Sequence, residues 1–409
     1  MPTKWSLIFR LAWRNVVRNR KRTAVILTAI AVGLWSMLIF AAFIRGWSND
    51  VTRNAISTLT GHLQIHAIGY LQDPSVDHSM SAPGEKLQKI LDGPEVVAWA
   101  SRIRVPAVVM SERETSGVTL VGIDPAAEKG LSFIADAVTE GRNLKGPRDS
   151  GIVIGRELAK QLSTEVGKRV VVMSQAADHS VADRGFRIVG VYDADRSSTE
   201  KNFIFVGEAE AGDMLGLGSG ISEISAILHD PSQVDSFVAG LRKAAGDLDI
   251  QPWTRLEPLA QAMVEMGRTW IWIFYVVMYI GMAFGLVNTL LMAVIERTRE
   301  FGLVQALGMR PPLILKQVIA ESSIVLGFGI AAGGILAALT LALLNDGIDF
   351  SAFAAGAEMW GMSKVIYPTL NAWDIASAVI IIFVLGTLAS LYPAFRAARK
   401  VPVDAITRG

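Results

Sequence analysis

The chain has 409 residues, of which 51% are hydrophobic and only 19% are charged, and it contains no cysteine. Soluble domains carry about 25% charged residues, so this composition argues against an ordinary soluble globule. The absence of cysteine excludes a disulfide scaffold, a cysteine-based zinc site, a thiol nucleophile and a lipidated N-terminal cysteine. The formal net charge of +1 conceals a strong segregation of charge along the sequence.

The first 22 residues are predicted to contain an amphipathic helix. At the helical period, Trp5 and Trp13 share one face, and Arg10 and Arg14 lie on the opposite face. Such a helix lies in the membrane interface, with tryptophan at the level of the headgroups and arginine directed toward phosphates. This segment is either a topology signal alone or an additional surface for a cytoplasmic partner.

Four apolar stretches are long enough to cross a bilayer, which takes about 20 helical residues. None of them carries a charge in its middle; they are Thr23 to Ile44, Trp270 to Val294, Ser322 to Leu344 and Asp374 to Pro393. The first stretch is longer than the apolar part of a signal peptide, and no small-residue cleavage site follows it. We therefore expect it to remain in the mature protein.

The distribution of charge predicts the orientation. Basic residues exceed acidic ones in 1–22, in 295–316 and in 396–409, whereas acidic residues exceed basic ones in 46–268 and in 345–374. Short loops that are rich in lysine and arginine stay on the cytoplasmic side. Both termini and the loop between the second and third spans are therefore expected in the cytoplasm.

The predicted fold class is an α-helical membrane protein with four transmembrane helices, arranged as one plus three, and a large α+β extracytoplasmic domain between the first and the second. In chain order, the predicted segments are an interfacial helix at 1–22, transmembrane helix 1 at 23–44, the extracytoplasmic domain at 45–269, transmembrane helix 2 at 270–294, a cytoplasmic connection at 295–312, transmembrane helix 3 at 313–344, an extracytoplasmic loop at 345–373, transmembrane helix 4 at 374–395 and a cytoplasmic tail at 396–409.

The domain at 45–269 mixes strand and helix patterns. Strands are predicted at Leu63 to Ala67, Val105 to Met110, Val118 to Ile123, Gly151 to Ile154, Arg169 to Met173, Phe186 to Tyr192, Phe203 to Val206 and Ile224 to Leu228. Helices are predicted at Glu85 to Leu91, Glu157 to Leu162 and Ser232 to Ala245. The segment 164–206 is predicted to be a small β-rich subdomain set into the larger domain.

This domain offers little catalytic chemistry. His62 and His66 flank an alternating strand pattern without a third ligand nearby, which disfavours a metal site. The glycine-rich run 216–220 lacks the lysine and hydroxyl residue of a phosphate-binding loop. We expect no enzymatic activity, no metal and no cofactor in this chain, and no nucleic-acid partner.

The short connection at 295–312 is more informative. Glu296 and Glu300 lie one turn apart, and Leu303 and Leu307 continue that face. Gly308 ends the helix before two prolines. The prediction is a short, stiff helix with one apolar edge that fits a groove of another protein. The alternative is a plain connecting turn, which would not need two apolar side chains in water.

A family resemblance rests on this connection. Its motif comprises Glu296, Arg297, Glu300, Phe301, Gly302, Ala306 and Gly308. It resembles the coupling-helix motif of the FtsX/MacB-type ABC transporter permeases. The segments 11–33 and 392–406 are similar to the ends of that family, and 253–259 resembles its lipoprotein-releasing LolC/LolE branch. The one-plus-three layout matches as well.

The resemblance implies a permease of the bacterial inner membrane that binds neither ATP nor magnesium itself. A cytoplasmic ABC ATPase dimer would bind both and would dock on the coupling helix, and a second permease, identical or homologous, would complete the complex. A periplasmic acceptor or adaptor is a further candidate partner, and membrane lipids surround the spans. The function implied first is extraction or release of lipoproteins or lipids. The alternatives are peptide or drug efflux of the MacB type and FtsX-like regulation of a cell-wall hydrolase.

An apolar shelter for a lipid-anchored substrate is predicted where two spans leave the membrane. Its candidate residues are Phe40, Phe43, Trp47, Met263, Met266, Trp270 and Phe274. Aromatic residues at these depths are also ordinary interfacial anchors. Two glycine pairs, Gly281 with Gly285 and Gly329 with Gly333, permit close helix approach, although such pairs also arise by chance. Asn288 and Glu321 are predicted to make interhelical or interfacial polar contacts.

Overall fold

The computed structural model describes residues 4–18, 20–296, 303, 311–350, 356, 363 and 365–398. The chain divides into two compact units. The helical unit comprises Met1–Asn49, Val264–Ala352 and Val365–Gly409, and the inserted unit comprises Asp50–Met263 and Phe353–Lys364. Each unit is described by itself.

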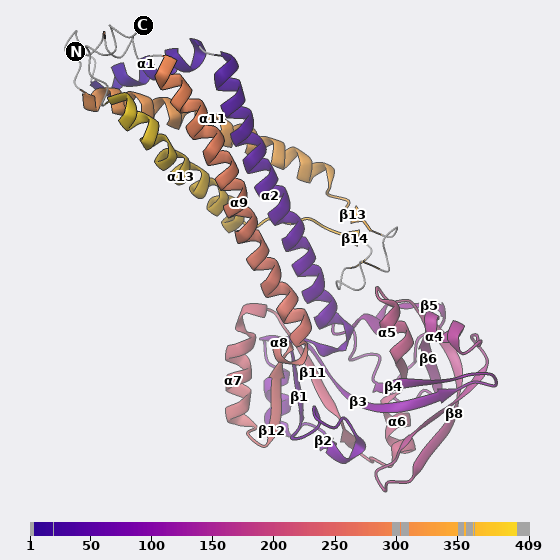
Figure 1. The fold of residues 1–409 in the computed structure, drawn as a ribbon. Helices are drawn as coiled ribbons and strands as arrows, with labels where there is room; N and C mark the ends of the chain where they lie inside the picture. Colours follow the sequence, from indigo (N-terminus) through magenta and orange to yellow (C-terminus); the bar gives the residue numbers. More distant parts are fainter. Residues whose placement is uncertain are drawn as a thin grey trace. The chain divides into compact units, whose positions relative to one another are not determined.

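The described part of the helical unit (Figure 1) consists mainly of the helices α1 (Lys4–Arg18), α2 (Arg20–Ala55), α9 (Pro258–Glu296), α11 (Pro311–Leu343) and α13 (Ala372–Ala398). All but α1 are long and apolar enough to cross a membrane. They contain the four predicted spans, except that α11 ends at Leu343, one residue before the predicted end. The other helix ends extend beyond the predicted ones, and α2 continues into the π-helix η1 (Ile56–Thr60). A short ladder pairs β13 (Ile348–Asp349) with β14 (Val365–Ile366).

The four long helices share one apolar core. Its buried members include Leu34 and Met37 of α2, Tyr275 of α9, Leu326 of α11 and Ile382 of α13. Only some of the apolar side chains of these helices pack into the core. Large side chains such as Phe284 and Leu339 remain exposed, as expected of surfaces that face lipid.

The two predicted glycine pairs differ in the structure. A Cβ atom on Gly333 would lie 2.6 Å from the carbonyl oxygen of Ala31, and one on Gly329 would lie 2.6 Å from Cγ2 of Ile30. This pair therefore permits close packing of α11 on α2, as predicted. Gly281 and Gly285 have no atom within 4 Å of such a Cβ among the residues described. Asn288 is exposed, whereas Glu321 is buried.

The inserted unit has two lobes that share one long strand, β3 (Val96–Met110). In the first lobe the strand order is β12 (Leu248–Pro252), β1 (Leu63–Ala67), β11 (Glu223–Leu228) and the first half of β3, all antiparallel. Helices α3 (Glu85–Leu91) and α7 (Val234–Ala244) contribute leucine and valine side chains to the core on one face of this sheet. Figure 1 shows α7 beside these strands.

In the second lobe the strand pairings close a ring, so that the sheet forms a barrel. The second half of β3 pairs with β4 (Thr115–Ile123), followed by β9 (Phe203–Gly207), β6 (Gly151–Gly155), β8 (Val181–Tyr192) and β7 (Arg169–Gln175), and β7 pairs again with β3. The interior is filled by alternate residues of these strands, among them Val105, Leu120, Ile154, Phe186 and Ile204. Alternation along each strand therefore directs the remaining side chains outward.

Helices α4 (Arg156–Gln161) and α6 (Glu208–Leu215) contribute to the barrel core, and β5 (Val138–Gly141) pairs with β8. The smaller elements are η2 (Val76–His78), β2 (Met80–Ser81), η3 (Phe133–Ala135), α5 (Ser197–Asn202), β10 (Gly220–Ile221), η4 (Pro231–Gln233) and α8 (Trp253–Leu256).

The predicted boundary of a β-rich subdomain at 164–206 needs correction. Strands β7, β8 and β9 of that segment do not form a sheet of their own, because the ring closes only with β3, β4 and β6. The barrel therefore draws on residues from about position 103 onward. Strand pairing between distant segments decided this boundary, and local patterns could not indicate it.

Candidate functional site

An apolar groove lies in the helical unit along α2. It has a volume of about 370 Å³ and is lined by Trp35, Ser36, Ile39, Phe40, Phe43, Leu344, Ile348 and Pro368. The indole Nε1 of Trp35 donates a hydrogen bond to Oγ1 of Thr340 at 2.9 Å, which ties α2 to α11 beside the groove. The lining from α2 belongs to the half of the helix that precedes the inserted unit in the chain.

The structure brings together some of the predicted shelter residues. The rings of Phe40 and Phe274 stack with their centroids 4.0 Å apart, and the ring of Phe43 lies 6.0 Å from that of Phe350. Both Phe40 and Phe43 line the groove. The helical period places them on one side of α2, about one turn apart.

The other predicted shelter residues lie elsewhere. Trp47 is buried against Gly267, where a Cβ atom would lie 3.3 Å from its ring. Met266 and Trp270 do not line the groove and remain 37% and 49% exposed. Met263 falls in the inserted unit.

Most of the predicted coupling helix lies outside the described residues. This applies to Arg297, Glu300, Phe301, Gly302, Ala306, Leu307 and Gly308. Glu296 ends α9, and Leu303 is 54% exposed.

A polar face of a sheet, which was not predicted from the sequence, lies in the inserted unit. On the sheet face opposite α3 and α7, the register aligns Asp249, His66, Glu223 and Arg102 in one row across β12, β1, β11 and β3. Three of these side chains, those of His66, Glu223 and Arg102, are completely buried. Polar residues at every second position were visible in the sequence, but such a pattern usually marks a solvated face.

Arg102 is the centre of this buried network. Its Nε and Nη2 atoms donate to the two carboxylate oxygens of Glu128 at 2.7 and 2.9 Å, and its Nη1 donates to Glu223 at 3.1 Å. Nη1 also donates to the carbonyl oxygen of Leu59 in η1, where a helix end leaves carbonyls without a partner of their own. Glu128 also accepts a hydrogen bond from Ser132.

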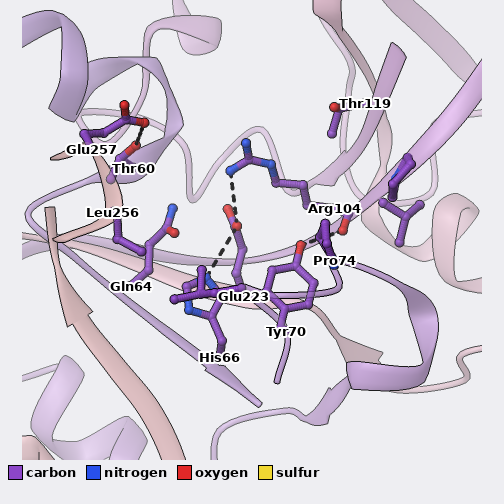
Figure 2. Close-up of a pocket in the computed structure, with 13 residues that line it drawn as sticks. Thr60, Gln64, His66, Tyr70, Pro74, Arg104, Thr119, Glu223, Leu256 and Glu257 are labelled. Carbon is purple, nitrogen blue, oxygen red and sulfur yellow. Dashed lines mark hydrogen bonds and ion pairs between the residues drawn. The ribbon is translucent and has the colours of Figure 1, made fainter. Parts of the chain in front are cut away.

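Figure 2 shows the pocket of about 250 Å³ that opens beside this network. Glu223 lies between Arg104, at 3.5 Å, and the ring of His66, at 3.9 Å. The ring of His66 stacks on Tyr70, whose hydroxyl donates to the carbonyl oxygen of Arg104 at 2.6 Å. Thr60 and Glu257 lie on the opposite side of the pocket.

Burial and neighbouring charges determine the protonation of these groups. Burial lowers the pKa of His66 below its ordinary value, so the ring is neutral near pH 7. Burial alone would raise the pKa of Glu223, but Arg104 and Arg102 outweigh it and hold that pKa below its ordinary value. Burial likewise opposes the charge of Arg102, yet its two carboxylate partners raise its pKa. Glu223 and Arg102 are therefore both charged. The described part of the chain holds no cluster of three or more potential metal ligands.

Comparison with known proteins gives the family. Residues 23–244 match the family described as the MacB-like periplasmic core domain, and residues 272–402 match the FtsX-like permease C-terminal part. The first match covers more than half of the chain. The chain belongs to the family of the MacB-like periplasmic core domain.

Relatives extend over nearly the full chain. The lipoprotein-releasing system transmembrane protein LolC of Neisseria meningitidis is 22% identical over 398 residues, covering 94% of this chain and 93% of the relative. LolE of Haemophilus influenzae is 23% identical over 429 residues, covering 98% and 99%. The macrolide export ATP-binding/permease protein MacB of Nitrobacter winogradskyi is 33% identical over 125 residues, covering 31% of this chain and 17% of that protein.

The predicted family is thereby confirmed: this member of the MacB-like family is an ABC transporter permease with an FtsX-like C-terminal part. Residues 23–244 include the barrel strands and His66, Arg102 and Glu223 of the polar face, so these belong to the MacB-like domain, whereas Asp249 of β12 lies beyond the matched segment.

Proposed function

We propose that this permease extracts or releases lipoproteins from the inner membrane, with both termini in the cytoplasm, and that it works with a second permease and with separate ATPase subunits that bind ATP and magnesium. The LolC and LolE relatives, which match over nearly their full lengths, support the choice of substrate. The structural observation that supports this proposal is the groove lined by Phe40 and Phe43, because a lipid anchor needs an apolar shelter outside the bilayer.

The energetic reason is the cost of exposing acyl chains. Each methylene that leaves the bilayer for water costs about 0.8 kcal/mol, so extraction requires both ATP and a surface that replaces the lipid. The groove offers aromatic and aliphatic side chains, and the stacked pair Phe40 and Phe274 lies next to it. Ser36 is the smallest side chain in its lining.

Filling the groove should stop transfer. Ser36→Phe places a ring into the groove, so the reconstituted complex should lose at least tenfold in the rate at which it passes a triacylated lipoprotein from proteoliposomes to a soluble acceptor. Basal ATP hydrolysis should be unchanged. The rate is measured by the amount of lipoprotein in the soluble fraction over time.

Val32→Phe is the matched control, since Val32 is exposed one turn earlier on α2 and does not line the groove. It should transfer lipoprotein at the wild-type rate. If the two variants transfer lipoprotein at equal rates, the groove has no role in the transfer. A wild-type complex that transfers no lipoprotein but expels a soluble peptide or drug would replace lipoprotein release by efflux of the MacB type.

The ATPase is proposed to dock on the helix at 295–312. Replacing both Leu303 and Leu307 by aspartate should bury unpaired charge in that interface, so the ATPase should no longer co-purify with the permease. Leu303 is exposed, which leaves it available for such a contact. Co-purification and ATP turnover are measured on complexes of equal permease content.

Val181→Asp is the control, because it places the same charge on an exposed apolar residue of the inserted unit. It should retain the ATPase. If the double variant also binds the ATPase and hydrolyses ATP at the full rate, residues 295–312 are a plain connector.

A further inference from the structure

The outer wall of the barrel carries an uncovered apolar strip, made of Pro106, Val108 and Met110 of β3 and Val171 and Met173 of β7. The register places Val108 opposite Met173 and Met110 opposite Val171, so these side chains form one continuous surface. All but Met173 are exposed. Exposed apolar surface that is continuous across two strands marks an interaction site more often than scattered apolar residues do.

Glycines beside the strip leave it open. Gly117 of β4 lies opposite Val108, and Gly185 of β8 lies opposite Val171. A Cβ atom on either glycine would meet no atom within 4 Å in the described part of the chain. No side chain stands beside the strip at these two positions, so an extended chain could approach the backbone of the barrel closely.

At one end, the strip leads directly into the pocket of Figure 2. Arg104 and Pro106 follow the same alternation along β3 as Val108, and both line the pocket. Thr119, the partner of Pro106 on β4, lines it as well. The pocket and the strip thus form one site with a polar end and an apolar stem.

The polar end contains buried groups without hydrogen-bond partners. His66 is completely buried, and neither of its ring nitrogens makes a hydrogen bond within the described residues; the same holds for Oε2 of Glu223. Buried polar groups of this kind are normally satisfied, so a ligand or water that supplies both a donor and an acceptor is expected here. Arg104 contributes further donors, since its guanidinium contacts Glu223 at 3.5 Å and lies over the ring of Phe203.

The charges select the class of ligand. Arg102 and Arg104 balance Glu128 and Glu223, and Glu257 adds one carboxylate on the opposite side of the pocket, so the charges disfavour an anion. A peptide group is uncharged and offers one donor and one acceptor. An acyl chain offers neither, and it would leave the ring nitrogens of His66 and Oε2 of Glu223 without hydrogen bonds.

We propose that the pocket and the strip together bind an extended, apolar polypeptide segment, with one peptide group in the pocket and alternate side chains on the strip. Side chains of an extended chain repeat on one face every two residues, as do those of β3 along the strip. This proposal is independent of lipid handling by the groove, which lies in the other unit.

The experiment uses the full chain in nanodiscs with ¹³C-methyl methionine, in which Met110 and Met173 are reporters within the strip; their signals are assigned with Met110→Leu and Met173→Leu. The probe is a capped hexapeptide of alternating valine and threonine. Saturable shifts of both signals are expected, while the signal of buried Met80 stays in place. Arg104→Met should weaken the binding about tenfold, which corresponds to the loss of about one hydrogen bond to a charged group.

Arg113→Met is the control for charge, because Arg113 is exposed and lies outside the pocket. Val108→Asp should abolish the shifts, and Val97→Asp, an exposed valine at the other end of β3, should not. An unchanged Met80 signal shows that each variant is folded. The absence of saturable shifts in the wild type would mean that water alone fills the pocket, and shifts produced by dodecanoate but not by the peptide would assign the site to lipid; either result overturns the proposal.

Discussion

Replacing Arg102 by methionine is expected to destabilise the inserted unit by about 3–5 kcal/mol, because removal of one partner leaves buried charges uncompensated. Glu128 and Glu223 would both lose their hydrogen bonds to the guanidinium, and both are completely buried. The carbonyl of Leu59 would lose one of its two donors and keep the side-chain amide of Gln64. For a unit of this size the midpoint of thermal unfolding should fall on the order of 10 °C, followed by near-ultraviolet circular dichroism of the full chain.

Arg142→Met is the matched control. Arg142 makes a comparable pair of hydrogen bonds with Asp149, at 2.6 and 3.2 Å, and lowers the pKa of that carboxylate to about 2. Its side chain is 41% exposed, so solvent screens the pair and the cost should stay within about 1 kcal/mol. If both variants melt alike, the network around Arg102 does not hold the unit together.

In the helical unit, Gly333→Ala is expected to loosen the packing of α11 on α2. The new Cβ would lie 2.6 Å from the carbonyl oxygen of Ala31 and 3.0 Å from Cβ of Leu34, so α11 would have to move away from α2. Overpacking of this kind costs about 1–3 kcal/mol. The apparent melting temperature of the purified chain in detergent should fall by several degrees.

The neighbouring Gly334 provides the control, since a Cβ there would meet no atom within 4 Å in the described residues. Gly334→Ala should leave the melting temperature unchanged or raise it, because alanine is favoured over glycine in a helix by about 1 kcal/mol. A fall as large as that of Gly333→Ala would show that the loss comes from the backbone and not from the contact with α2.

Local patterns predicted most of the elements of the inserted unit. Strand Leu63–Ala67 and helix Glu85–Leu91 have the predicted bounds, because apolar residues alternate in the first and recur at the helical period in the second. Strand β3 was predicted only from residue 105, and its first half, with Trp99 and Arg102, was missed. Strand β12 was also missed, since Asp249 and Gln251 interrupt its apolar pattern. Helix α6 was missed because Gly212 interrupts its helical pattern.

The candidate site was predicted less completely. Phe40 and Phe43 were chosen for their position in the chain, and the structure places them in one groove because they lie about one turn apart on α2. Trp47, one turn further on, is buried instead by the close approach of α9 at Gly267. The sequence shows that such a residue is near the end of a span, but not which neighbour covers it.

By itself, the sequence determined the four apolar helices, because each depends on about 20 apolar residues in a row. It also determined the family, because the motif that begins at Glu296 is a contiguous segment. It also predicted the mixture of strands and helices between the first two spans. The ring closure of β3 with β7, the alignment of His66 with Glu223 and Arg102, and the groove along α2 were decided only by the tertiary structure. Each of these depends on the register or packing of segments far apart in the chain, and a shift of one residue would turn every side chain of a strand to the opposite face.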